Sequence, residues 1–267
     1  MTIHEFLFYI VILLSNIIQG ITGFAGTILA MPFSIRLVGM DTAVPVLNFL
    51  GLLSGIYVCA GNYKKIDWKV LRKVVIIMGA ALIAGIFIKG KLSGNPHLLY
   101  LILGCIVLAI AVQGLCKSVY ASEQCARNSS SSKNTTDNNS PINSQHGGIF
   151  SGIFLTSILV AAGMVHGMFV CGGPLLISYM TRKLPEKAAF RATISTVWIF
   201  LNGILFISHI LSGAWTPAVI KSGAVSVPFL LGGMFIGGKL YSRMSQEFFV
   251  KLTYVLLLIA AISLFLK

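Results

Sequence analysis

The chain has 267 residues, of which 56% are hydrophobic and only 10% are charged, and its mean hydropathy is +0.89. Soluble domains carry about 25% charged residues, so this composition excludes an ordinary soluble protein and indicates a polytopic membrane protein. The net charge of +13 does not indicate nucleic-acid binding. The Lys and Arg residues lie in short clusters between apolar segments, where positive charge sets membrane topology.

No cofactor or metal site is indicated. The five cysteines are odd in number and form no CxxC pair, so neither a disulfide framework nor a zinc site is expected. HExxH and GxSxG motifs are both missing from the sequence. We therefore predict that the protein is not an enzyme and uses no cofactor.

Apolar segments follow one another along almost the whole chain, and a membrane-spanning helix needs roughly 20 such residues. In chain order they lie near 3–35, 41–61, 70–89, 97–116, 148–180, 188–211, 216–238 and 247–266. A polar stretch rich in Ser, Asn and Thr, 117–147, is predicted to be a disordered linker. It separates an N-terminal transmembrane repeat, 1–116, from a C-terminal one, 148–267. The predicted fold is all-α, with two homologous halves of four segments each.

The first segment of each half contains a glycine-rich break. One break spans Gln19–Gly26 and the other spans His166–Pro174. Irregular backbone in hydrocarbon leaves N–H and C=O groups unpaired, at several kcal/mol each. Such backbone is tolerated only where it is buried in protein or lines a watery cavity, so a matched pair of breaks points to the substrate site of a transporter.

Two sequence matches indicate that the halves arose by duplication. The segment 85–92 matches 233–240 at six of eight positions, with an offset of 148 residues. Gly20 and Gly167, at the start of the two breaks, are offset by 147. Two matches at nearly one offset are not expected by chance, even in apolar sequence.

Charge placement favours re-entrant hairpins for the first segment of each half. If all eight segments cross, the 20 Lys and Arg residues divide equally between the two sides. If segments one and five instead enter and leave on the same side, the division becomes fifteen to five, as the positive-inside rule requires. The five on the minority side are Arg36, Lys89, Lys91, Lys221 and Lys267. About 15 apolar residues flank each break, too few for a helix to cross. Three full crossings per half would then make the repeats inverted.

A half-helix that begins after each break would point free N–H groups and a partial positive charge into a cavity, which suits a small anion. Pro32 and Pro174 fit near such helix starts. Polar residues of the second segments are expected to bond across helices, one or two of them also touching substrate. The candidates for substrate binding are Gln19, Gly20, Thr22, Gly23, Gly26, His166, Gly167, Cys171, Gly172, Gly173 and Arg191.

Alternatives remain open for three of these candidates. His166 could pass a proton during transport, or it could only hydrogen-bond a freed backbone carbonyl. Arg191 could bind the anion, or it could be an interfacial charge that snorkels to the membrane surface. Cys171 fits a small buried filler better than a nucleophile. The clustered glycines themselves could merely allow close helix packing.

At these residues the chain resembles the sulfite exporter TauE/SafE family of membrane permeases, over essentially everything but the linker. Gly20, Gly23, Gly26 and Pro32 look like the first family motif, and Gly167, Gly172, Gly173 and Pro174 look like the second. The chain departs from the family at Phe24-Ala25 and at Val170, where glycines are expected. The resemblance implies transport of sulfite, sulfonates or other small sulfur-containing organic anions.

We therefore predict a secondary transporter that moves a small sulfur-linked anion across the cytoplasmic membrane, with a proton as the candidate coupling ion. The linker 117–147 is predicted to be cytoplasmic, and the partners are the substrate and the lipid bilayer. The alternative is a non-transporting membrane accessory subunit or an intramembrane enzyme.

Overall fold

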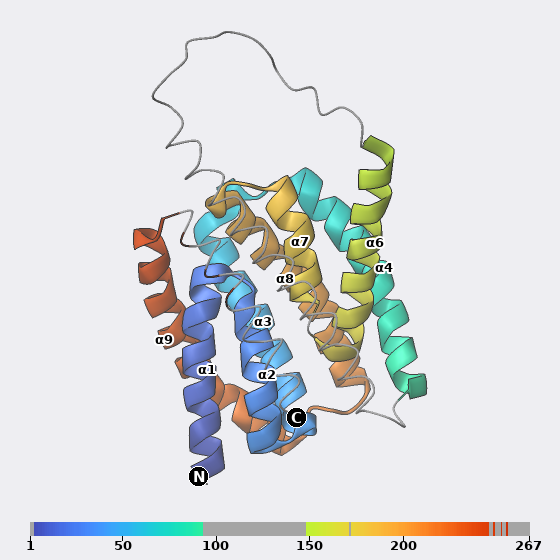
Figure 1. Cartoon of the computed structure of the whole chain (residues 1–267). Helices are drawn as coiled ribbons and strands as arrows, with labels where there is room; N and C mark the ends of the chain where they lie inside the picture. The colour runs from blue at the N-terminus through green and yellow to red at the C-terminus, as the bar shows by residue number, and fades with distance from the viewer. Residues whose placement is uncertain are drawn as a thin grey trace.

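The described structure is helical throughout. The computed structural model describes residues 3–92, 148–170 and 172–245, with 248, 252 and 255. Its elements, shown in Figure 1, are α1 (Ile3–Thr22), α2 (Ala25–Val38), α3 (Met40–Asn62), the 3-10 helix η1 (Tyr63–Lys65), α4 (Trp68–Leu92), α6 (Gly148–Phe169), α7 (Gly173–Lys183), α8 (Lys187–Leu211) and α9 (Pro217–Arg243). The all-α class is confirmed. The predicted segment 97–116, the linker 117–147 and nearly all of 247–266 lie outside the described residues.

Five of the described helices are long and apolar enough to cross a membrane: α1, α3 together with η1, α4, α8 and α9. This finding confirms a multi-pass membrane protein. The expectation that both arms of each break are too short to cross is wrong for α1, whose 20 residues extend about 30 Å. The second arms are short, with 14 residues in α2 and 11 in α7.

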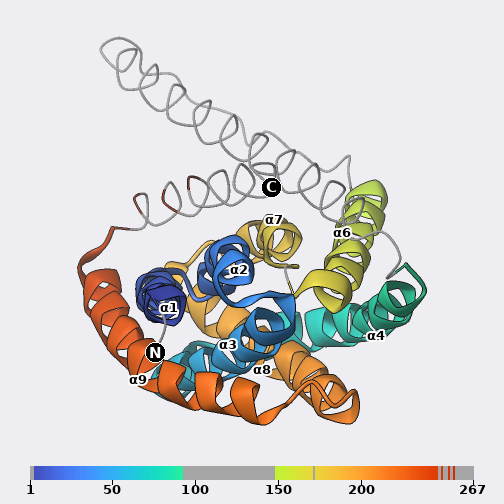
Figure 2. The same ribbon diagram turned by 90° about the horizontal axis from the view of Figure 1, so that it is seen from below.

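The helices of the two halves interlock. Helix α1 packs along α9 and α6 packs along α4, while α3 and α8 pack against each other. Figure 2 shows α9 and α4 at the outside of the bundle, with α3 and α8 between them. The broken helix of each half therefore packs on the last described helix of the other half. Followed from N- to C-terminus in Figure 1, α1 and α3 run upward and α2 and α4 run downward. The corresponding helices of the second half run the opposite way, with α6 and α8 downward and α7 and α9 upward.

The repeated glycine motif lies at the two outer crossings. A Cβ atom added to Gly85 of α4 would collide with the backbone carbonyl of Met164 in α6. A Cβ atom added to Gly233 of α9 would lie 2.7 Å from the carbonyl oxygen of Leu13 in α1. Small residues let membrane helices approach this closely. The motif thus permits the same close backbone contact between α4 and α6 as between α9 and α1.

Candidate functional site

The first break is a left-handed turn at Gly23, between α1 and α2. Gly23 has φ +83°, and its N–H donates to the carbonyl oxygen of Gln19 over 2.7 Å, which closes the last turn of α1. A Cβ atom added to Gly23 would lie 2.7 Å from Oγ of Ser195 and 3.3 Å from the carbonyl oxygen of Arg191. Both the backbone conformation and the close approach of α8 therefore favour glycine here.

The second break repeats this turn with a valine. Val170, 147 residues after Gly23, has φ +59°, and its N–H donates to the carbonyl oxygen of His166 over 2.8 Å. A β-branched residue in this region is an outlier, and the left-handed conformation costs an L-residue about 1–2 kcal/mol. Val170 is 4% exposed, so its surroundings hold the strained conformation. Val170 stands where the family resemblance predicts glycine, and its backbone still adopts the left-handed conformation that glycine favours.

Side chains of α1 cap the start of α2. Gln19 accepts a hydrogen bond at Oε1 from the N–H of Gly26, at 2.7 Å, and donates from Nε2 to Oγ of Ser54 in α3, at 3.1 Å. The N–H of Ala25 donates to Oγ1 of Thr22 over 3.1 Å. These bonds satisfy donors that the first turn of a helix leaves without intrahelical partners. Fewer free N–H groups therefore remain at α2 than the sequence suggests.

His166 plays the corresponding role at α7. The N–H of Gly172 donates to Nδ1 of His166 over 3.3 Å, and Nε2 lies 3.2 Å from Oδ1 of Asn202 in α8. That oxygen also accepts from Nδ2 of Asn48 in α3, over 3.2 Å. This pattern assigns the proton to Nε2 and leaves Nδ1 as an acceptor. A second proton on Nδ1 would face the Gly172 N–H, so the geometry favours a neutral imidazole. His166 therefore hydrogen-bonds the backbone, but it accepts from an N–H group, whereas the sequence suggested a bond to a carbonyl group.

Two side chains of α8 satisfy carbonyl groups at the end of α1. Arg191 donates from Nη2 to the carbonyl oxygen of Gly20 over 2.5 Å, and Ser195 donates from Oγ to that of Gly23 over 3.3 Å. The Arg191 guanidinium also lies over the ring of Tyr241, 4.3 Å from its centroid. Arg191 is only 5% exposed, so it does not snorkel, and it complements the negative end of α1.

Gly20 and Gly167 lie at helix crossings. A Cβ atom added to Gly20 would lie 3.0 Å from Cα of Gly237 in α9. One added to Gly167 would collide with the carbonyl of Leu82 in α4. The structure therefore places these two candidates where α1 meets α9 and where α6 meets α4.

A small cavity lies between the two breaks. Its lining residues are Gln19, Phe24, Thr27, Ile28, Gly51, His166, Val170, Gly173, Trp198 and Asn202. Its volume of about 10 Å³ is room for about one water molecule. The candidates Gln19, His166 and Gly173 border it, and so does Asn202, one of the polar residues of the second segments. Cys171 lies outside the described residues.

The described lining of the cavity combines helix N-termini with uncharged side chains. Among the described residues that line it, none is Asp, Glu, Lys or Arg. The first turns of α2 and α7 border it through Thr27, Ile28 and Gly173, and helix N-termini carry a partial positive charge. Elsewhere in the described chain, no group of three His, Cys, Asp or Glu residues lies close enough to hold a metal ion.

Comparison with known proteins identifies one family. The family described as Sulfite exporter TauE/SafE matches the chain over residues 8–264. No curated protein and no solved structure matches it. The match spans both halves and includes both helix breaks.

We predict that Gly23→Ala abolishes transport, because the added methyl group would be strained at positive φ and would also push against α8. The matched control is Gly213→Ala. Gly213 has φ +71° in the α8–α9 loop, and a Cβ atom there would meet nothing within 4 Å. Transport per folded protein should stay near wild type in the control. Equal transport by the two variants would show that the contact with α8 is unimportant.

Proposed function

Because the chain belongs to the sulfite exporter TauE/SafE family of membrane transporters, we propose that it moves a small sulfur-containing oxyanion across the cytoplasmic membrane. Sulfite and sulfonates are the substrate class. The observation that carries the proposal is the cavity that both helix breaks border, which presents helix N-termini and, among its described lining residues, no charged side chain.

Helix ends supply the attraction for an anion at this site. Each helix N-terminus contributes about 0.3–2 kcal/mol toward a nearby negative charge, and two of them border the cavity. Hydrogen bonds to an anion are roughly twice as strong as bonds between neutral groups. An uncharged lining also lets the substrate leave, because no fixed opposite charge holds it.

Transport requires the walls of the cavity to move. Its volume of about 10 Å³ is too small for a sulfur oxyanion, which is larger than the one water molecule that fits. Corresponding helices run in opposite directions in Figure 1, and each broken helix packs on the other half, which supports inverted repeats. Rocking of one repeat against the other around the breaks would then open the site to either side in turn.

In proteoliposomes that contain the purified protein, labelled sulfite should accumulate above the level of empty liposomes. Uptake should be inhibited by other small oxyanions and unaffected by cations or neutral amino acids, because the site offers donors and positive helix ends. The same assay with an imposed proton gradient tests coupling. A clean preference for a cation in competition would refute the anion site and the sulfur-anion assignment together.

We further propose that the linker 117–147 faces the cytoplasm. The basic residues near η1, the start of α4 and the end of α7 all lie at the upper end of Figure 1. At that end Lys65 of η1 pairs with Glu186 before α8 over 3.8 Å. Arg36 and Lys221 lie in α2 and α9, on the minority side of the charge division. Concentration of positive charge at one end favours that end as the cytoplasmic one.

A variant that keeps only Cys125, within the linker, should resist a membrane-impermeant thiol reagent in intact cells and react after permeabilisation. The matched control is a cysteine-free chain with Ser212→Cys, at the exposed α8–α9 loop on the opposite side, which should react in intact cells. The reverse labelling pattern would invert the proposed orientation.

A further inference from the structure

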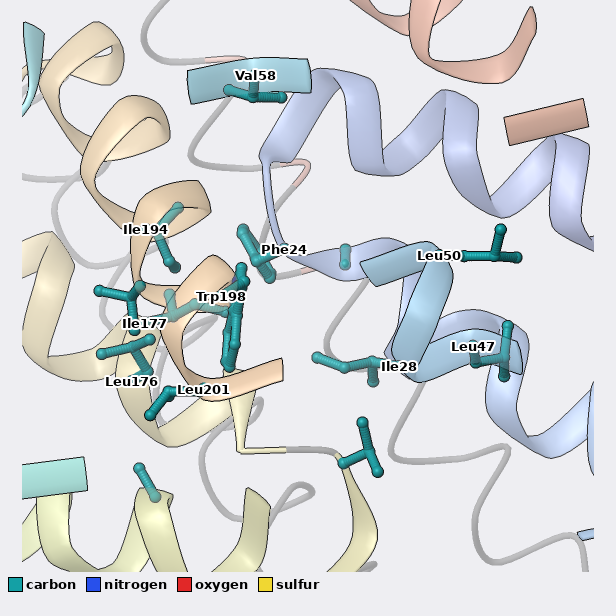
Figure 3. Packing of buried hydrophobic residues seen from close by; sticks show 14 of the residues in the cluster. Phe24, Ile28, Leu47, Leu50, Val58, Leu176, Ile177, Ile194, Trp198 and Leu201 are labelled. Atoms are coloured by element: carbon teal, nitrogen blue, oxygen red, sulfur yellow. The ribbon is translucent and has the colours of Figure 1, made fainter. Parts of the chain in front are cut away.

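One buried donor beside the cavity has no partner. Trp198 of α8 is 5% exposed and lines the cavity, and its Nε1 has no hydrogen-bond partner in the described part of the chain. Figure 3 shows the ring between α8 and the first break, near Phe24 and Ile28. Its centroid lies 4.9 Å from that of His166. Buried polar atoms are paired in the great majority of cases, so this exception needs an explanation.

The two halves differ at this position. Trp198 follows Gly51 by 147 residues, the offset that relates Gly20 to Gly167, and both Gly51 and Trp198 line the cavity. A Cβ atom added to Gly51 would lie 2.7 Å from Nδ2 of Asn202, so a side chain here would displace the Asn202 amide. At this pair of corresponding positions, only the C-terminal half contributes a side chain to the described cavity lining.

Resting on the proposed function, we propose that Trp198 is the specificity-determining residue of the site, and that its indole N–H donates a hydrogen bond to an oxygen of the anionic substrate. An indole N–H is a donor and never an acceptor, so the group that pairs with it must carry a lone pair. The N-terminus of α7 at Gly173, beside the same cavity, attracts negative charge. Together the two features select a small oxyanion over a cation or a group that can only donate.

The geometry also explains why a neutral donor suffices. The site lies within the bundle, where a buried Lys or Arg would need compensation by other groups. An N–H dipole has no net charge to desolvate, yet its bond to an anion is charge-assisted. Trp198 thus adds attraction for the substrate without adding a fixed cation that would hold it.

Intrinsic fluorescence of the purified full chain, titrated with sodium sulfite and with sodium methanesulfonate, tests this role. Sodium chloride at matched ionic strength serves as the baseline. Trp198→Phe keeps an aromatic ring but removes the donor, and it should weaken apparent affinity at least about tenfold and reduce the fluorescence response. The matched control is Trp215→Phe. Trp215 also has a buried Nε1 without a partner in the described chain, but it packs against Phe49 and Phe206 and does not line the cavity.

Trp215→Phe should bind both anions as the wild type does, and thermal unfolding of the two variants should agree within a few degrees. A wild-type response that persists with unchanged affinity in Trp198→Phe would overturn the role of Trp198 and leave the proposed transport intact. A wild type that responds to neither anion, and transports neither, would overturn the proposed function and this inference with it.

Discussion

The structure depends on the pairing of backbone groups where two membrane helices are interrupted. In hydrocarbon no water can satisfy these groups, and each unpaired one costs several kcal/mol. Here Gln19 and His166 cap the N–H groups of the following helices. Arg191 and Ser195 reach across from α8 to the carbonyls that end α1. Side chains of the second half thus stabilise the break in the first half. Movement of one half relative to the other would therefore change the contacts at this break.

The same pairing leaves a cavity whose described lining residues are polar or apolar but uncharged. Most donors and acceptors around the cavity are engaged with each other, through Ser54 in one network and through Asn48 and Asn202 in the other. Among the described residues that line the cavity, Trp198 is the exception, because its buried Nε1 has no hydrogen-bond partner. A carrier must bind its substrate and then release it, and helix dipoles with neutral donors provide attraction without a permanent counter-charge.

Much of this arrangement could be predicted from the sequence, and the parts that could not have physical reasons. Glycines in apolar sequence mark both breaks, so their existence and the helical class were predictable. The prediction that a helix begins near Pro174 is correct, because Pro174 lies in the first turn of α7. The same prediction for Pro32 is wrong, because Pro32 lies inside α2. The left-handed turn at Val170 gives no signal, since valine disfavours it. In the sequence, Trp198 is indistinguishable from an ordinary core residue of an apolar helix. Only the structure shows that it lines the cavity and that its Nε1 has no partner in the described chain.

The most direct test compares sulfite transport by His166→Gln and His166→Leu. Gln19 already makes the corresponding pair of bonds in the first half, so a glutamine at 166 should accept from the Gly172 N–H, donate to Asn202 and retain most transport. Leucine would leave the Gly172 N–H unpaired and would remove one of the two donors to Oδ1 of Asn202, which Asn48 also contacts, and it should abolish transport. Loss of transport in His166→Gln as complete as in His166→Leu would contradict the account, because it would show that the imidazole itself is needed and not its capping of the break.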